Sequence, residues 1–151
     1  MDAVTIADLY DQIIEGEDIP KIAYLLRRLP AEKAAHMLPG WPYSILTNLA
    51  HADFWQRVWL GRLEGRPKPK FQDDWRIPRL EEYDEIRASF LDNLLHARKI
   101  AQKWPVDHHV TNDERALHTL VSLAVHDAYH IGQIKLMSRI LDGGAEESEE
   151  V

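Results

Sequence analysis

Apolar residues recur at helical spacing in every long segment of this chain, and no segment keeps the strict alternation of a half-buried β-strand. The N-terminal segment shows the pattern at Ile6, Leu9, Tyr10, Ile13 and Ile14, which share one face of a helix with about 3.6 residues per turn. The sequence contains no internal repeat that would suggest a solenoid. We therefore predict an all-α protein.

Proline, glycine and capping residues divide the sequence into four predicted helices, over residues 3–29 with a break near 16–20, 42–65, 79–103 and 111–143. Pro42 suits the first position of the second helix. The segment Thr111-Asn112-Asp113-Glu114 has the spacing of a capping box at the start of the fourth. The proline-containing segment 66–78 is predicted to be a loop. Four such helices pack most economically as a four-helix bundle with its site between facing helices.

Length and composition indicate one domain. A chain of 151 residues with 45% apolar and 28% charged residues can bury a sizeable core. We assign residues 1–141 to the helical bundle and predict that the acidic segment 142–151 is disordered. The net charge is −7 at pH 7, with Lys and Arg interspersed among the acids, which argues against a nucleic acid or an anionic membrane as partner.

The sequence contains no cysteine, which excludes disulfides, cysteine nucleophiles and thiolate zinc sites within it. This composition fits a reducing compartment, and we expect a cytoplasmic protein. No apolar run approaches the roughly 18 residues of a membrane span, and the acidic N-terminal residues do not resemble a secretory signal.

A pair of histidines four residues apart, His126 and His130, lies in the last predicted helix. Residues at i and i+4 share a helix face, so both imidazoles can converge on one metal ion. Their face also carries Leu123 and Met137, whereas the cations of the segment lie on the opposite side, and the pair therefore points inward. Two inward imidazoles need polar partners, which a metal or, in the alternative, a structural hydrogen-bond network would supply.

His51 is the best candidate for a third ligand among the other histidines. It shares a predicted face with Ser44, Thr47, Trp55 and Val58, opposite Asp53 and Arg57, although apolar Leu46, Leu49 and Leu60 also lie on that far side. The alternatives are weaker: His96 falls on a charged face, His118 lies about 12 Å from His126 along the same helix, and His36, His108 and His109 fall in predicted connections. We predict a metal site formed by His51, His126 and His130.

Two segments of the chain resemble the signature segments of the DinB/YfiT-like superfamily of metalloenzymes. They are Tyr43-Ser44-Ile45-Leu46-Thr47-Asn48-Leu49-Ala50-His51 and the segment from His126 through His130 to Gly132-Gln133. The resemblance covers nearly the whole chain, except that Tyr43 stands where members commonly have Trp. It implies a four-helix bundle, a histidine triad carried over onto His51, His126 and His130, and a homodimer.

The resemblance also implies a divalent-metal enzyme, with transfer of a low-molecular-weight thiol as the best-attested activity. Three neutral imidazoles leave a divalent ion its full charge and an open position, which can activate a thiol or a water, and nitrogen ligands suit zinc or nickel. Gln133, one turn beyond His130, is our candidate for positioning the small-molecule substrate or a water, or else a polar cap on the core. Trp55 is interpreted as core or as a wall of the pocket.

Two alternative functions remain open from sequence alone. The segment from His126 to His130 has the H-E-x-x-H spacing with Asp127 in place of Glu, as in a metalloprotease, but an all-helical chain offers no sheet edge for a peptide. We interpret Asp127 instead as a residue that supports a ligand or faces solvent. The other alternative is a non-enzymatic helical binding or dimerisation module with a structural ion or none. Apolar Leu46, Leu49 and Leu60 could supply the contact of the homodimer that the resemblance implies, although burial within the monomer explains them as well.

Overall fold

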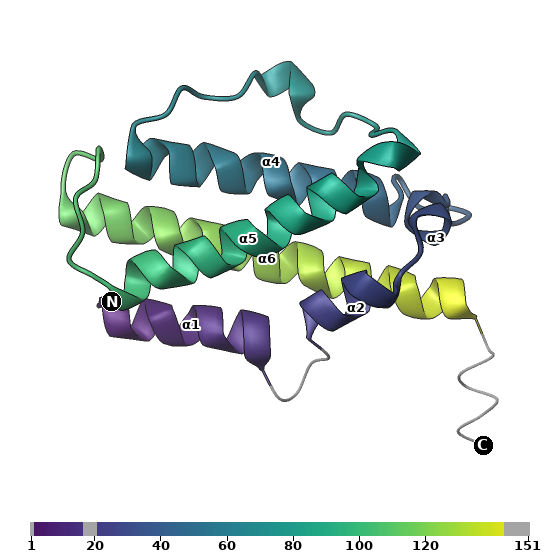
Figure 1. Cartoon of the computed structure of the whole chain (residues 1–151), viewed down its shortest axis with the longest axis horizontal. Helices are drawn as coiled ribbons and strands as arrows, with labels where there is room; N and C mark the ends of the chain where they lie inside the picture. Colours follow the sequence, from purple (N-terminus) through teal and green to yellow (C-terminus); the bar gives the residue numbers. More distant parts are fainter. Residues whose placement is uncertain (1, 17–20, 144–151) are drawn as a thin grey trace.

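The computed structural model describes residues 2–16 and 21–143, and all regular structure within these ranges is helical (Figure 1). The α-helices are α1 (Ala3–Glu15), α2 (Ile22–Arg28), α3 (Ala31–Ala35), α4 (Ile45–Glu64), α5 (Tyr83–Gln102) and α6 (Asp113–Asp142). Two short 3-10 helices, η1 (Phe71–Asp73) and η2 (Leu80–Glu82), lie between α4 and α5. The predicted all-α class is confirmed.

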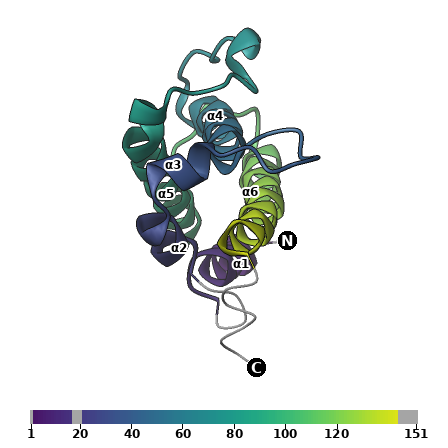
Figure 2. The ribbon, with the colours of Figure 1, turned by 90° about the vertical axis from the view of Figure 1, so that its right-hand side faces the viewer.

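Helices α1, α4, α5 and α6 lie side by side around one apolar core (Figure 2). Helix α4 packs against both α5 and α6, and α1 packs against the same two helices on the other side of the core. Two buried tyrosines link the elements: the Tyr10 hydroxyl donates to the Leu120 carbonyl at 2.6 Å, and the Tyr83 hydroxyl donates to the Leu26 carbonyl at 2.9 Å. Facing α4 and α6 thus provide the inner surface on which a site can be built.

The predicted helix over residues 3–29 is two separate helices. Helix α1 ends at Glu15, and the N–H of Gly16 donates to the Gln12 carbonyl, while α2 begins at Ile22; residues 17–20 lie outside the described residues. Helix α3 was not expected, because its five residues are too few to show a period. These short helices cover one end of the core with Leu26 and Ala34.

Three predicted helix starts are wrong by a few residues. Helix α5 begins at Tyr83 rather than at residue 79, and Leu80–Glu82 form the 3-10 helix η2 before it. Helix α4 begins at Ile45 rather than at Pro42, because Ser44 caps it and accepts a hydrogen bond from the Thr47 N–H at 3.1 Å. Helix α6 is capped by Asn112 rather than Thr111, through the Arg115 N–H at 2.9 Å. Several residues of a short polar segment can each cap the helix that follows, and the sequence alone does not show which of them does so.

The predicted helix ends agree better with the structure. Helix α4 ends before Gly65, which has a positive φ of 75°, and a Cβ atom there would come within 2.8 Å of the His109 ring. Glycine is required at this position. Helix α6 ends at Asp142, so that residue belongs to the helix and not to the predicted disordered tail; residues 144–151 lie outside the described residues.

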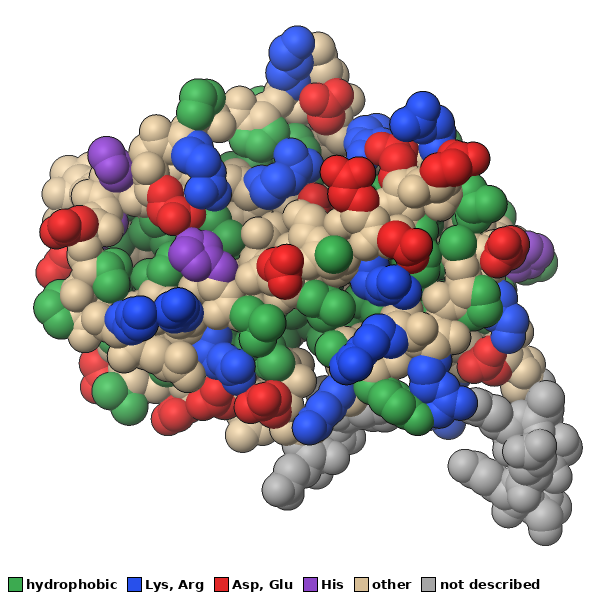
Figure 3. All heavy atoms as spheres, in the orientation of Figure 1, with side chains coloured by type: hydrophobic (Ala, Val, Ile, Leu, Met, Phe, Trp, Pro, Cys, Tyr) green, Lys and Arg blue, Asp and Glu red, His purple; other side chains and the backbone are tan. Residues whose placement is uncertain are grey.

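The surface carries mixed charge. On the face drawn in Figure 3, Lys and Arg side chains are interspersed with Asp and Glu side chains. In the described part of the chain, no helix combines the length and the apolar character needed to cross a membrane.

Candidate metal centre

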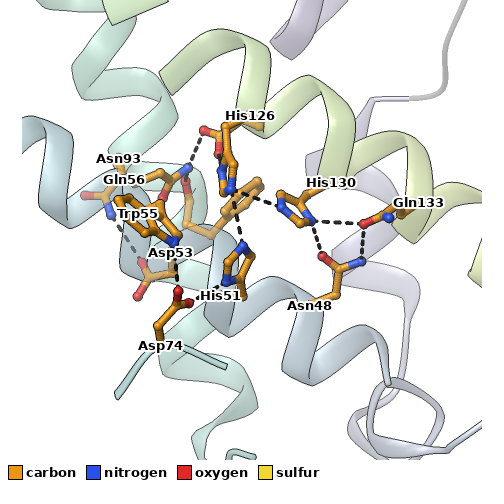
Figure 4. A network of polar contacts seen from close by, with 12 residues as sticks. Asn48, His51, Asp53, Trp55, Gln56, Asp74, Asn93, His126, His130 and Gln133 are labelled. Carbon is orange, nitrogen blue, oxygen red and sulfur yellow. Dashed lines mark hydrogen bonds and ion pairs between the residues drawn. The ribbon is translucent and has the colours of Figure 1, made fainter. Parts of the chain in front are cut away.

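Helices α4 and α6 bring His51, His126 and His130 together (Figure 4). The Nε2 atom of His126 lies 3.3 Å from the Nε2 of His51 and 3.1 Å from the Nε2 of His130. One nitrogen of each ring falls within 4.8 Å of the other two. His51 and His130 are buried and His126 is half-buried. The three histidines singled out in the sequence are therefore close enough to hold one metal ion.

His51 is oriented by a carboxylate from the loop between α4 and α5. Its Nδ1 lies 2.5 Å from Oδ1 of Asp74, whose Oδ2 accepts a hydrogen bond from the Trp55 indole N–H at 3.1 Å. A carboxylate on Nδ1 favours the tautomer that carries the proton there, and this leaves the Nε2 lone pair directed at the other histidines. Trp55 is half-buried beside this pair, as a wall of the site and not as part of the core.

His130 is oriented by two side-chain amides. Its Nδ1 lies 2.6 Å from Oδ1 of Asn48 and 3.0 Å from Oε1 of Gln133. That Gln133 oxygen also accepts hydrogen bonds from the Asn48 amide at 3.1 Å and from the Tyr43 hydroxyl at 3.3 Å. Gln133 therefore contacts the side of the His130 ring that faces away from the shared Nε2 position, and it connects α6 with the start of α4.

His126 differs from the other two histidines because its Nδ1 is buried and has no hydrogen-bond partner among the described residues. Oδ1 of Asp127 lies 4.0 Å from this nitrogen, and it too has no hydrogen-bond partner in residues 2–16 and 21–143. The other oxygen of Asp127 accepts a hydrogen bond from the Gln56 amide at 2.7 Å. Asp127 is fully buried, so the alternative that it faces solvent is wrong, and burial raises the pKa of its carboxyl group.

Aromatic rings surround the histidine cluster. Trp75 stacks on the His51 ring at a centroid distance of 3.6 Å and an angle of 12°, and Tyr43 lies 4.6 Å from Trp75. Trp59 contacts the His126 ring edge-on at 5.1 Å. Trp75 has a positive φ of 58°, a conformation that costs a non-glycine residue of order 1–3 kcal/mol and that concentrates at functional sites.

All three histidines are shifted toward the neutral form. Burial, followed by the neighbouring His130 and His51, lowers the pKa of His126 to about 3. Burial and His51 lower the pKa of His130 to about 4, and burial also lowers the pKa of His51 although Asp74 opposes the shift. The imidazoles are therefore neutral at neutral pH, as metal ligation requires.

The donor set fits a divalent metal ion better than a purely hydrogen-bonded network. Because Asp74 and the two amides engage Nδ1 of His51 and His130, both rings present lone pairs at Nε2. A single proton on Nε2 of His126 cannot serve both of its close contacts, whereas a cation between the three atoms serves all of them. Three imidazole nitrogens suit zinc, nickel or copper.

The remaining histidines lie outside the cluster. His96 is largely exposed and pairs with Glu64 at 3.1 Å, and His108 pairs with Asp113 at 2.7 Å. His36, His109 and His118 are exposed. The elimination of these histidines from the metal site agrees with their positions in the structure.

Two groups on the side of α4 opposite His51 are buried within the chain. Asp53, which the sequence places on that side, is buried and accepts hydrogen bonds from Ser89 at 2.5 Å and Asn93 at 3.2 Å. Of the two explanations for Leu46, Leu49 and Leu60, burial within the monomer is confirmed, because all three are buried in the single chain, and they do not supply a dimer contact. Helix α4 is covered by α5 on one side and α6 on the other, so it has two buried faces instead of one.

Asp74, Trp75 and Asn48 were not identified from the sequence as parts of the site. Asn48 was quoted within the Tyr43–His51 segment, and its spacing of three residues from His51 was the available signal. Asp74 and Trp75 follow a proline-containing segment without periodicity, and nothing in the sequence indicates that this loop folds back over α4 (Figure 1).

Together, the fold and the cluster define an all-helical protein with three histidines positioned to hold a metal ion. Comparisons of the chain with protein-family models, with curated proteins and with solved structures find no match.

Proposed function

We propose that the chain binds one divalent metal ion, zinc or nickel, through Nε2 of His51, His126 and His130, and that it is an enzyme of the DinB/YfiT-like type acting on a small molecule. The observation that carries this proposal is the convergence of three Nε2 atoms whose rings are held from behind by Asp74, Asn48 and Gln133. The packing of α1, α4, α5 and α6 agrees with the bundle that the resemblance implies.

A divalent ion on three neutral imidazoles would keep its full charge and an open position, and would thereby acidify a thiol or a water at neutral pH. The residues of the chain contribute orientation and exclusion of water. Asp74 and the amides hold the ligand rings, and Trp75, Trp59 and Tyr43 form an aromatic rim that lowers the local polarity. We favour a low-molecular-weight thiol as nucleophile, with water as the second candidate.

The metalloprotease alternative is disfavoured by the surroundings of Asp127. A general base must reach the reacting atoms beside the metal. Asp127 is fully buried, accepts a hydrogen bond from Gln56, and lies on the Nδ1 side of His126. A homodimer and a cytoplasmic location stay predictions, as does the alternative of a non-enzymatic module with a structural ion.

The proposal is tested by metal analysis of protein purified without a histidine tag, followed by assays of thiol conjugation and of ester and amide hydrolysis. We expect about one ion per chain, activity that chelation abolishes and one added divalent ion restores, and no activity in a folded His130→Ala variant. A metal-loaded protein that binds no thiol and turns over no substrate would favour the structural module.

A further inference from the structure

A groove that contains no residue of the metal centre lies between α1 and α6. It has a volume of about 280 Å³, and its lining includes Leu9 and Ile13 of α1 and Val125, Ala128 and Gly132 of α6. The three histidines, the side chains that orient them and the aromatic rim all lie outside this lining. The groove is therefore independent of the proposed metal site.

The part of α6 that lines the groove is apolar on its exposed side. The side chain of Val125 is 63% exposed and that of Leu136 is 53% exposed. Between residues 123 and 136 the helix contains two charged residues, the fully buried Asp127 and Lys135. A surface helix normally presents several charged side chains to solvent, and an apolar exposed surface marks a place where another molecule binds.

Gly132 lies in the middle of this exposed surface. Glycine inside a helix is less favourable than alanine, because its backbone loses more conformational freedom on folding. A Cβ atom at residue 132 would meet no heavy atom of the described residues within 4 Å beyond its own helix backbone and chain neighbours, so packing within the chain does not require glycine there. Without a side chain, this residue leaves the groove open and lets a ligand approach the backbone of α6.

Lys135 supplies the one charged group of the lining, and Gln12 is the other polar residue. The lysine is half-buried, and burial lowers its pKa. Within the described ranges no carboxylate pairs with it, whereas Lys33 pairs with Asp142 at 3.2 Å. A partly desolvated ammonium group without a counter-ion favours an anionic partner.

The order of the lining residues along α6 fixes where an anionic group would lie. These residues extend from Ala124 to Lys135, roughly 17 Å along the helix axis, and Lys135 is the last of them. A volume of about 280 Å³ spread over this length makes a narrow groove, which suits an unbranched chain better than a ring system. One ammonium group balances one negative charge, which is the charge of a carboxylate at neutral pH.

We propose that the groove between α1 and α6 binds an unbranched, medium-chain carboxylate, whose alkyl chain packs on Leu9, Val125 and Ala128 and whose carboxylate pairs with Lys135. A second copy of the chain is the competing occupant of an apolar helix face. In a twofold dimer, however, the same face would meet itself. The exposed part of this face between residues 123 and 136 carries the lysine as its charged residue and would offer that lysine no counter-ion.

The test follows binding through the amide resonances of Gly132 and Ala128 in proton–nitrogen NMR spectra of the full-length protein. Hexanoate, octanoate and decanoate are titrated, with octanol as the neutral match of octanoate. We expect the affinity to rise about fourfold for each methylene that the groove buries. Octanoate should bind about tenfold more tightly than octanol, which corresponds to one charge-assisted hydrogen bond.

The variant Lys135→Gln should lower the affinity for octanoate about tenfold and leave the affinity for octanol unchanged. Lys99→Gln, at an exposed residue of α5 outside the groove, should change neither. Gly132→Leu places a side chain in the groove and should abolish the binding of both molecules, whereas Gly132→Ala should retain most of it. Thermal melting followed by circular dichroism checks that each variant is folded.

If no carboxylate shifts the resonances of Gly132 and Ala128 at millimolar concentration, the proposal is overturned. Equal octanoate affinities of Lys135→Gln and the unsubstituted protein would overturn it too, because the lysine would then not bind the carboxylate. Dimerisation in sedimentation experiments that Gly132→Leu abolishes would assign the groove to a second copy of the chain instead. All of these results are independent of metal binding by the histidines, since the titrations are made with and without added zinc.

Discussion

His126 is the histidine of the cluster with the least support from its neighbours, since its Nδ1 has no hydrogen-bond partner within the described part of the chain, whereas Nδ1 of His51 and of His130 are both engaged. All three nevertheless point Nε2 at the same position. Because each ring supplies one of only three ligand atoms, metal binding by the cluster depends on all three histidines.

We expect His51→Ala, His126→Ala and His130→Ala each to lose the metal ion, whereas His96→Ala retains it. His96 is the matched control because it also pairs with a carboxylate, Glu64, but lies outside the cluster. Metal content of the purified variants, determined by mass spectrometry, is the measurement. Equal retention in His51→Ala and His96→Ala would contradict the assignment of ligands.

The lowered pKa values predict the pH dependence of the metal-free protein. The folded-state pKa is about 3 for His126 and about 4 for His130, and both values lie below the ordinary value of 6.5. At a pH between the folded-state and the ordinary pKa, the unfolded chain therefore binds more protons than the folded chain. The stability that these two histidines contribute to the metal-free protein should therefore fall as pH decreases from about 6.5 toward 4, whereas the raised pKa of the buried Asp127 acts in the opposite direction.

Urea denaturation of the metal-free protein at a series of pH values measures this dependence. A His126→Phe variant lacks one of the two groups and should lose less stability over the same range. Equal changes in stability between pH 6.5 and 4 in the His126→Phe variant and in the unsubstituted protein would contradict the prediction.

The same pKa values mean that protons compete with the metal in the folded protein only well below pH 6.5. Unperturbed imidazoles would already bind protons in place of the metal near pH 6.

At the level of single residues, the sequence predicted which side chains lie on the shared inner face of α4 and α6, but it did not predict that other polar side chains of these helices are buried as well. The spacing of His126, His130 and Gln133 sufficed to place them together. The burial of Asp53 was not predicted and that of Asp127 was left open, because a polar residue away from the apolar face is normally solvated. Here, Ser89 and Gln56 supply the hydrogen bonds that make their burial possible.

Among the structural elements, the loop between α4 and α5 has the largest influence on the site. Asp74 and Trp75 reach back over α4, where one hydrogen-bonds His51 and the other stacks on it. No periodic signal predicts the path of such a loop, because its conformation is set by contacts with distant residues and includes a positive φ at Trp75. The helices of the site were thus predictable, and the element that covers them was not.

We expect Asp74→Asn to weaken metal binding about 10- to 100-fold, because the amide removes the charge that holds His51 in its ligating tautomer. Asp73→Asn is the matched control, since Asp73 is the exposed neighbour in η1. Competition with a chromophoric chelator measures both affinities. An Asp74→Asn variant that binds metal as tightly as Asp73→Asn would show that the carboxylate does not support His51.

For the whole molecule, the all-helical class and the four longest helices were predictable because their apolar periodicity extends over 13 to 30 residues. Less could be predicted about the short α2 and α3 and about the caps of α4 and α6. Each of these features depends on one or two local hydrogen bonds. The metal centre joins α4, α6 and the 66–79 connection, which are distant in sequence. Its ligation should therefore stabilise the global fold and not only one helix.

The last prediction concerns that coupling. An ion that binds only the folded chain, and whose free concentration is 1,000 times its dissociation constant, adds about 4 kcal/mol to the free energy of unfolding. For a chain of 151 residues this corresponds to a rise in melting temperature of roughly 8–16 °C. Differential scanning calorimetry of the apo protein with and without added zinc or nickel measures the rise, which should disappear in His130→Ala and persist in His96→Ala. A rise of equal size in both variants would place the stabilising ion elsewhere on the chain, because His96 lies outside the cluster and His130 supplies one of its three Nε2 atoms.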